Sequence, residues 1–301
     1  MSFMMRETVR RSWPNLYHRP ARQDAGMVSC APLTPHCAMP MFTTIRPTTP
    51  NSPALNAQLA ILTHAHSELM AAVLGAVQPG MATADLADMA REQAKKRGIG
   101  LTMRTNMGFP DDISVCLNTQ AMNAIPSRTT LIKDGDAVKL AVCGTDGAGA
   151  FCVQNWSMQA GTILPRRRLL LEHARACIDA AVPLCRPGVT VSALAAQLGK
   201  SALEKGIFLS PQFAGHMIGA EPILPPMIVK PKSWFGTDHV LTEGTVLSLF
   251  VLAHEGKPTL TERGDGWTVI DRQGGLSAAF SHMVRVASAP QVLTGAYPLH
   301  A

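Results

Sequence analysis

Histidine, cysteine and aspartate side chains could bind a metal ion or activate a nucleophile, and their spacing limits what they can do here. The chain has ten histidines and seven cysteines, and no two cysteines form a C-x-x-C pair. The His36-Cys37 pair has no second pair to complete a zinc site. His64 and His66 stand two residues apart on an expected helix, where two side chains cannot share one ligand. None of these groups alone predicts a metal centre or a nucleophilic site.

The chain contains an internal repeat. Residues 79–87 recur 108 residues later as residues 187–195, and residues 134–142 recur 109 residues later as residues 243–251. A repeat of this size predicts two related halves with a site on the axis between them.

The hydrophobic periodicity predicts helices followed by strands in each half. Helices are expected at 53–77, beginning at Ser52-Pro53, at 83–97, beginning with Thr83 as the cap, at 166–182 and at 190–205. Strands are expected at 113–117, 137–142, 151–158, 246–253, 267–270 and 283–286. This order predicts an α+β fold with a pseudo-two-fold repeat, in which a curved, mainly antiparallel sheet is covered by helices on one side. Parallel βαβ winding is the alternative.

Composition excludes several classes of function. The chain is 47% apolar and 16% charged, with a net charge of +6. About half of the excess charge lies in the first 40 residues, and the rest of the chain has no concentrated basic patch, so nucleic-acid binding is not expected. No apolar run approaches the roughly 18 residues of a membrane span. An odd number of cysteines without framework spacing favours a reducing compartment, so we expect a cytoplasmic location without membrane attachment.

Residues 1–50 and residues 51–301 differ in pattern. The first segment carries proline and arginine without periodicity, which predicts a disordered arm or upstream sequence before a true start at Met41. An Arg-rich targeting or nucleic-acid arm is the alternative. Residues 51–301 are expected to form a single domain.

A series of short motifs, taken with the repeat, resembles the type I methionine aminopeptidases. These metallopeptidases of family M24 have the pita-bread fold that creatinase and the proline dipeptidases share. The matching motifs extend over most of residues 51–301 and are Gly108-Phe109-Pro110, Ser114-Val115-Cys116, Ile125-Pro126, Lys133-Asp134-Gly135-Asp136, Gly215-His216-Met217-Ile218-Gly219, Glu221-Pro222, Asp265-Gly266-Trp267-Thr268-Val269, Leu276-Ser277-Ala278 and His282. The resemblance implies the pita-bread fold.

The resemblance also shows where this chain departs from the family. Active members hold two divalent metal ions with two aspartates, one histidine and two glutamates. The histidine is retained as His216, whereas the other four positions fall on Ala141, Val153 in the simplest register, Phe250 and Ser281. These residues supply no carboxylate to neutralise or bridge two cations. We therefore expect no metal and no other cofactor.

The expected pocket follows from the same resemblance. Phe109 and Trp267 match aromatic residues that hold the methionine side chain in the family, and Asn123 stands where the family has a substrate-orienting histidine. The other expected pocket residues are Phe250, Ser281 and His282. Asp111 and Asp112 follow Pro110 and are typical of a solvated turn, with a role in gating the cleft as the alternative.

His216 is the candidate catalytic residue, and its role remains open. One interpretation is a core histidine that is hydrogen bonded to a backbone carbonyl. The other is a general base or a donor to a ligand in the residual cleft. A nucleophile pair of Ser281 and His216 is a further hypothesis, although no acid is evident to orient the histidine.

The sequence leaves two classes of function open. The first is a catalytically degenerate, metal-free protein that uses the pocket to bind a small molecule, a peptide N-terminus or a partner. The second is an enzyme: an active aminopeptidase that removes N-terminal methionine, or a metal-independent hydrolase that cleaves a C–N bond around His216. A gene product without a selected function is a third interpretation.

Overall fold

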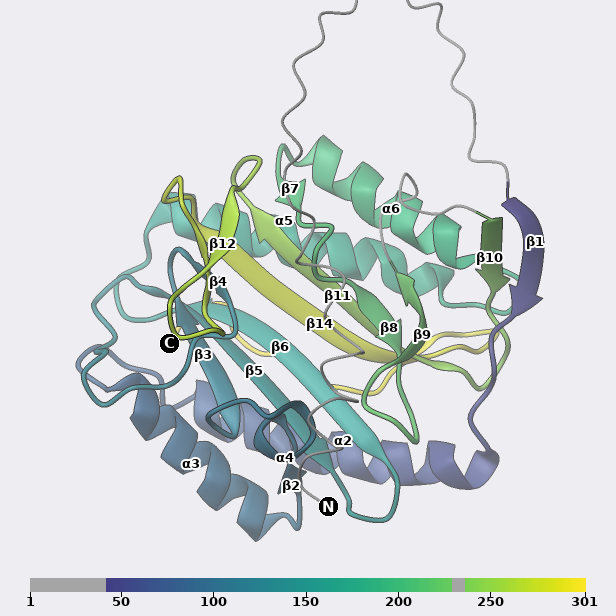
Figure 1. Cartoon of the computed structure of the whole chain (residues 1–301), viewed down its shortest axis with the longest axis horizontal. Helices are drawn as coiled ribbons and strands as arrows, with labels where there is room; N and C mark the ends of the chain where they lie inside the picture. Colours follow the sequence, from purple (N-terminus) through teal and green to yellow (C-terminus); the bar gives the residue numbers. More distant parts are fainter. Residues whose placement is uncertain (1–41, 229–235) are drawn as a thin grey trace, which may run out of the picture.

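The computed structural model describes residues 42–228 and 236–301 (Figure 1). The first half contains β1 (Phe42–Pro47), α2 (Pro53–Leu74), α3 (Thr83–Lys96), β2 (Gly100–Leu101), α4 (Met103–Met107), β3 (Ile113–Leu117), β4 (Gln120–Met122), β5 (Ala137–Thr145) and β6 (Phe151–Gln159). The second half contains α5 (Pro165–Ala181), the 3-10 turn Val182–Leu184, α6 (Val191–Glu204), β7 (Phe208–Leu209), β8 (Gly215–Met217), β9 (Leu224–Ile228), β10 (Gly236–Val240), β11 (Val246–His254), β12 (Leu260–Glu262), β13 (Val269–Asp271), β14 (Ser277–Arg285) and β15 (Gln291–Val292).

The architecture is the expected α+β arrangement. Strand β5 pairs antiparallel with β3 and β6 in the first half, and β11 pairs antiparallel with β8 and β14 in the second. The long helices α2, α3, α5 and α6 lie on one side of these strands (Figure 1). The main apolar core therefore lies between the helices and the sheet, and the opposite face of the sheet is left for a site.

The helix starts follow from local side-chain chemistry, with one correction. Ser52 accepts the N–H of Leu55 at 3.1 Å and Pro53 is the first helical residue, as the sequence predicted. The expected cap at Thr83 is wrong, because Ala82 precedes the helix and Asp85 Oδ2 accepts the Ala82 N–H at 2.9 Å. The aspartate three residues into α3 thus supplies the acceptor that a side chain at the cap position would otherwise provide.

Several strands extend beyond their expected ends. Strand β14 begins at Ser277 rather than 283 and pairs with β11 along its whole length. The small residues at its start carry no apolar alternation, so the sequence pattern underestimated the strand. The expected strand at 267–270 is shifted to β13, and Trp267 lies in the preceding turn.

The expected structureless segment 1–50 overlaps an ordered strand. Strand β1 pairs in parallel with β10, and Thr48 Oγ1 is hydrogen bonded to Thr245 Oγ1 at 2.8 Å. The ordered region thus begins before residue 51. The expectations for residues 1–41, including the His36-Cys37 pair, lie outside the described residues. In residues 42–228 and 236–301, no helix has the length and apolarity that a membrane span requires.

Strands β6 and β14 join the two halves across the repeat axis. Ser157 Oγ donates to the Ala279 carbonyl at 2.8 Å and accepts the Ala279 N–H at 2.8 Å. Ser281 Oγ accepts the Asn155 N–H at 2.8 Å. These buried hydroxyl groups replace the missing backbone ladder between the two strands, so the axis is held by defined polar contacts.

Candidate functional site

In the first half, the residues at the family's metal-ligand positions lie on one face of the β5–β6 hairpin. Ala141 is paired with Asn155, and Cys143 is paired with Val153. Side chains alternate between the faces of a strand, so paired residues and those two positions away share a face. Ala141 and Val153 therefore lie on the same face, and neither has a polar side-chain atom.

The second half places its corresponding residues on the same face of the β11–β14 pair. Phe250 is paired with Ser281, and Ser248 is paired with His216 of β8. Phe250 is 8% exposed and Ser281 is fully buried. The Asn155 N–H bond to Ser281 Oγ connects this face to that of the first hairpin. The structure thus brings together positions that are more than a hundred residues apart in the chain.

His216 has the backbone contact expected of a core histidine. Its Nδ1 lies 2.9 Å from the Met217 carbonyl oxygen. For this to be a hydrogen bond, Nδ1 carries the proton, which leaves Nε2 as the acceptor in the neutral ring. Burial lowers the pKa of His216 below its usual value. The side chain is therefore a neutral imidazole near pH 7.

The structure does not pair Ser281 with His216. Ser281 Oγ accepts hydrogen bonds from the Asn155 N–H at 2.8 Å and from Asn155 Nδ2 at 3.5 Å. The His216 ring nitrogen Nδ1 contacts the Met217 carbonyl instead. A serine nucleophile activated by histidine requires a hydrogen bond between the two side chains. Ser281 is bonded to Asn155 and His216 to Met217, so the structure does not support this hypothesis.

Three of the expected pocket residues lie together at one end of the site. Phe109 is 1% exposed and packs edge-to-face against Trp267, with ring centroids 5.3 Å apart. Asn123 directly follows Met122, which is paired with Val269 of β13. The pairing therefore brings Asn123 beside the turn that carries Trp267. The structure thus brings Phe109, Trp267 and Asn123 close together, with the Phe109 ring buried beneath Trp267.

The turn before Phe109 needs a glycine. Gly108 ends α4 with φ +69°, a conformation that costs little without a Cβ atom. The Phe109 N–H then donates to the Met103 carbonyl at 3.1 Å. This local geometry holds the backbone that presents the Phe109 ring.

Phe250 belongs to an apolar cluster that is separate from the main core. Its buried members are Ala121, Phe213, Phe250, Leu252, Val269 and Ala279. The cluster joins the sheet face to β4 and β13, which carry the neighbours of Asn123 and Trp267. An aromatic ring at position 250 therefore extends the apolar wall across the face where the family places a carboxylate.

His282 does not lie in the expected pocket. Its Nδ1 is 3.0 Å from Thr294 Oγ1, and its ring centroid is 5.8 Å from that of Trp156 in the main core. His282 follows Ser281 in the strand and so points to the opposite face. The sequence motif retains the residue, but strand alternation places it on the helix side of the sheet.

The sequence reading missed Lys139. This side chain is 3% exposed, and its Nζ donates to the carbonyl oxygens of Asn118 at 2.9 Å and Ser277 at 3.2 Å. It shares a strand face with Ala141, two residues away. Burial lowers the pKa of Lys139 to about 8. The sequence did contain a signal for this buried cation, because Lys139 stands within an otherwise apolar strand.

Asp111 and Asp112 also differ from expectation. Their side chains are 15% and 19% exposed and form ion pairs with Arg91. They are therefore not the solvated turn that the sequence indicated, because Arg91 of α3 pairs with both and Arg104 of α4 pairs with Asp112.

The side chains on this face do not fit a pair of divalent cations. Among residues 42–228 and 236–301, no group of three or more His, Cys, Asp or Glu side chains is placed to hold a metal ion. His216 is the one imidazole at the family's ligand positions, and Ala141, Val153 and Phe250 present hydrocarbon. Removing a dication from water without compensating ligands costs many kcal/mol. The arrangement instead provides an apolar surface with a few polar groups.

Comparisons with known proteins match the fold and most of the chain. The family model for metallopeptidase family M24 matches residues 57–288. The chain is 26% identical over 238 residues to the methionine aminopeptidase of Aquifex aeolicus, covering 76% of this chain and 91% of that protein. It is 28% identical over 211 residues to methionine aminopeptidase A of Synechocystis, covering 70% and 82%.

Solved structures agree with the expected pita-bread fold. The methionine aminopeptidase of Thermotoga maritima matches with a TM-score of 0.77 at 20% identity, covering 82% of this chain and 99% of that one. Prolidase from Pyrococcus furiosus matches with a TM-score of 0.63 at 15% identity, covering 82% of this chain and 66% of that one. The expected fold is therefore confirmed.

Proposed function

The chain belongs to metallopeptidase family M24, and we propose that it acts there as a metal-free binding or regulatory protein instead of a metallopeptidase. One observation carries the proposal: the sheet face that holds His216 presents Ala141, Val153 and Phe250 where the family has carboxylates. Replacing every carboxylate together avoids leaving one buried charge unpaired. These residues fit an apolar binding surface and do not fit a metal centre that has lost only some of its ligands.

The Lys139 ammonium supports the same proposal. It lies two residues from Ala141 on the same face of β5, so the two Cα atoms are separated by roughly 6.6 Å. Within residues 42–228 and 236–301, the hydrogen-bond partners of Lys139 Nζ are the carbonyl oxygens of Asn118 and Ser277, and no carboxylate forms an ion pair with it. A positive charge with no anionic partner repels an incoming dication, and in a desolvated site this repulsion is strong.

The ligand we propose has an apolar side chain. The half-buried Trp267 ring supplies the apolar surface, backed by the buried rings of Phe109 and Phe250. Asn123 and Nε2 of His216 are the polar groups beside it. A small molecule or a peptide N-terminus of this kind fits a site with a few placed polar groups on an apolar lining. No nucleic acid or membrane is needed for this role.

The deciding experiment measures metal content. Full-length protein is purified with added manganese or cobalt, dialysed and analysed by elemental analysis. We expect less than about one tenth of a metal ion per chain, because His216 alone cannot retain a dication against buffer. The matched control is His216→Ala, which should contain as little metal as the wild type. Stoichiometric metal that is lost in the variant would overturn the proposal.

A metal-independent hydrolase is the second candidate, favoured by the protonation of His216. With Nδ1 donating to the Met217 carbonyl, the neutral ring has Nε2 available as a general base. Its test is methionine release from a Met-Ala-Ser peptide in the presence of a chelator, compared with His216→Ala. Release above that control favours the hydrolase, and equal background rates favour the binding protein.

The binding role has its own test in thermal-shift screening. Methionine and the Met-Ala-Ser peptide are the first ligands, with Trp267→Ala as the variant lacking the half-buried ring. A ligand that raises Tm in the wild type and not in the variant supports the pocket. Equal shifts in both proteins place the ligand elsewhere and contradict the proposed site.

A further inference from the structure

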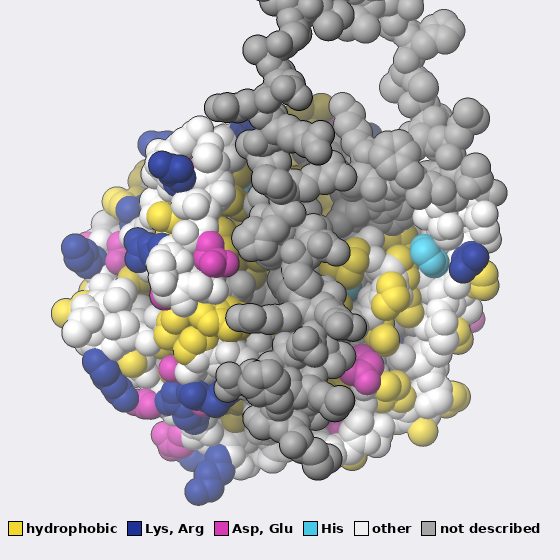
Figure 2. Space-filling view, in the orientation of Figure 1, with side chains coloured by type: hydrophobic (Ala, Val, Ile, Leu, Met, Phe, Trp, Pro, Cys, Tyr) yellow, Lys and Arg dark blue, Asp and Glu magenta, His cyan; other side chains and the backbone are white. Residues whose placement is uncertain are grey.

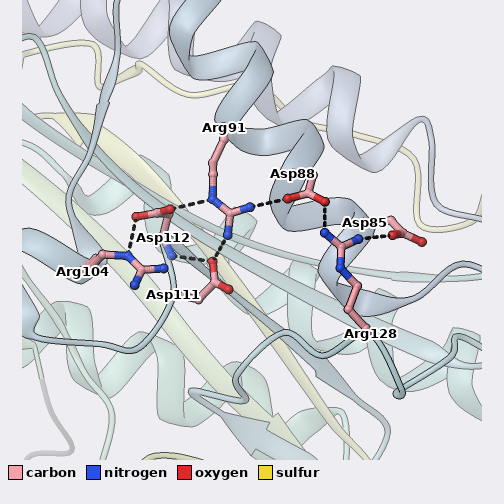
Figure 3. Close-up of polar contacts among 7 residues, drawn as sticks. All are labelled: Asp85, Asp88, Arg91, Arg104, Asp111, Asp112 and Arg128. Atoms are coloured by element: carbon pink, nitrogen blue, oxygen red, sulfur yellow. Dashed lines mark hydrogen bonds and ion pairs between the residues drawn. The ribbon is translucent and has the colours of Figure 1, made fainter.

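Helix α3 presents a row of charged residues toward two loops of the site. Asp85, Asp88 and Arg91 recur at three-residue spacing and therefore lie on one helix face (Figure 3). Figure 2 shows Lys/Arg and Asp/Glu side chains interspersed over the surface where Figure 1 places α3 and α4. Seven residues form the network, which we name the α3 clamp: Asp85, Asp88, Arg91, Arg104, Asp111, Asp112 and Arg128.

One arm of the α3 clamp holds the loop that carries Phe109. Arg91 Nε donates to Asp112 Oδ2 at 2.7 Å, and Arg91 Nη2 donates to Asp111 Oδ1 at 2.7 Å. Arg104 Nε also donates to Asp112 Oδ1, at 3.2 Å. The two aspartates begin two residues after Phe109. A guanidinium that binds both neighbours at once fixes the orientation of this short segment as well as its position.

The other arm holds the segment that follows Asn123. Arg128 Nη1 donates to Asp85 Oδ1 at 2.6 Å, and Arg128 Nη2 donates to Asp88 Oδ2. The neighbouring Ser127 N–H donates to Thr83 Oγ1 at 2.9 Å. The segment is therefore attached to the first two turns of α3 by side-chain and backbone contacts.

Asp88 joins the two arms. Its Oδ1 accepts from Arg91 Nη1 at 2.5 Å, and its Oδ2 accepts from Arg128. The hydrogen bond from Arg128 is the main cause that lowers the pKa of Asp88, so the carboxylate is charged near neutral pH. A single carboxylate thus faces one arginine that holds the Phe109 loop and one that holds the Asn123 loop.

We infer that the α3 clamp positions both loops of the ligand site and couples them through Asp88. This inference rests on the proposed binding function, because the two loops matter together only where one ligand contacts both Asn123 and the Trp267 ring that Phe109 supports. Isolated exposed ion pairs contribute little, but a network that includes a forked arginine restricts geometry more strongly. The residues of the clamp act as positioning residues and do not touch the ligand.

The test uses hydrogen exchange on the full-length protein, which reads each loop separately. Asp88→Asn should raise amide exchange by at least about threefold both in residues 108–113 and in residues 123–128. Arg91→Lys retains charge without the fork and should affect the first segment, whereas Arg128→Lys should affect the second. Glu92→Gln is the matched control, because Glu92 lies on the same helix and pairs with Lys96 outside the clamp.

The outcomes separate positioning from general stability. Faster exchange in both segments with unchanged exchange in β5 and β11 supports the coupling. In Asp88→Asn, a change in one segment alone, in neither, or equally throughout the protein would overturn it. If Asp88→Asn does not fold, Asp88→Glu keeps the charge while displacing the carboxylate, and the same outcomes decide the coupling.

A ligand measurement distinguishes failure of this inference from failure of the proposed function. The Tm shift produced by the Met-Ala-Ser peptide is compared in wild type, Asp88→Asn and Glu92→Gln. Loss of the shift in Asp88→Asn alone connects the clamp to binding, and an unchanged shift in all three overturns that connection. If the peptide shifts none of them, the proposed ligand is wrong, and the exchange data still decide the coupling of the two loops.

Discussion

The sheet face around His216 and the α3 clamp differ in how they use charged side chains. On the sheet face, Ala141, Val153 and Phe250 present hydrocarbon side chains. In the clamp, each carboxylate contacts at least one arginine (Figure 3). The difference shows that every acidic residue of the clamp is paired with an arginine of the chain, whereas the sheet face, in the described part of the chain, holds a buried lysine and no carboxylate to pair with it.

The two regions also differ in solvent exposure. Phe250 and Ser281 are almost completely buried, so a charge introduced there has no water to solvate it. Clamp residues such as Arg128 remain largely exposed, so losing one partner is partly compensated by solvent. Substitutions that introduce a charge on the sheet face should therefore lower the free energy of unfolding more than substitutions in the clamp.

The largest effect is expected for Phe250→Glu, which introduces one carboxylate into the apolar sheet face. An unpaired buried charge should lower the free energy of unfolding by about 3–5 kcal/mol. Urea unfolding at pH 7 measures the loss, and Phe250→Leu is the control that keeps the site apolar, with an expected cost below about 1.5 kcal/mol. Equal stability of the two variants would show that the face is wetter or more adaptable than the structure indicates.

The next effect concerns Lys139 and appears as a dependence on pH. Its pKa falls from 10.5 to about 8 on folding because of burial. Below pH 8 both states hold the proton, whereas between pH 8 and 10.5 the unfolded chain binds a proton that the folded protein releases. Stability therefore rises with pH in this window, by up to about 3 kcal/mol for this group.

Lys139→Met tests that dependence. The variant has no group to titrate at this position, so the gain between pH 8 and 10.5 should disappear when its unfolding free energy is compared with that of the wild type. The variant also leaves the carbonyls of Asn118 and Ser277 without their shared donor, at a cost of about 1–3 kcal/mol. Parallel stability curves for the two proteins would show that Lys139 keeps its usual pKa.

A smaller effect is expected in the α3 clamp. Arg91→Gln removes the forked contact with Asp111 and Asp112 and should cost about 1 kcal/mol at low salt, since the group is partly exposed. The loss should shrink when the ionic strength rises from 0.05 M to 1 M. Thermal unfolding at both salt concentrations measures it, with Glu92→Gln as the comparison. A loss that is independent of salt would mean that packing, and not charge, holds the loop.

The smallest effect is expected from added metal. Millimolar Mn²⁺ should change Tm by less than about 1 °C, because a ligand that does not bind the native state cannot stabilise it. The triple change of Ala141, Phe250 and Ser281 to Asp, Glu and Glu provides the contrast, since it restores carboxylates to the same face. An increase of several degrees in the wild-type Tm would show that the sheet face binds metal, which contradicts the comparison.

The sequence predicted most of the fold because the repeat and the periodicity are local properties of the chain. Strand β3 and the N-terminus of α2 at Ser52 were predicted at their observed positions. Strand β14 was underestimated, because Ser277 and the alanines after it carry no apolar alternation and are held by pairing with β11. Partner strands far away in the chain determine such ends.

The candidate site was predicted less completely. Phe109 and Trp267 were each expected to line a pocket from the motifs, whereas their edge-to-face contact was seen only in the structure. His282 was misplaced, because a motif records that a residue is present and not which face of the strand it occupies. Asp111 and Asp112 were interpreted as a solvated turn, because their partner Arg91 lies about 20 residues away on a helix that the pattern alone could not orient.

The sequence by itself determined the two-fold repeat and the pita-bread fold, since residue types and spacing contain that information. Only the tertiary structure decided that Lys139 is buried beside Ala141, that His282 faces the core, and that Asp88 connects the two loops of the site. The physical reason is that burial, pairing and pKa depend on which distant side chains meet, and these contacts arise only when the two halves of the sheet and helix α3 pack together.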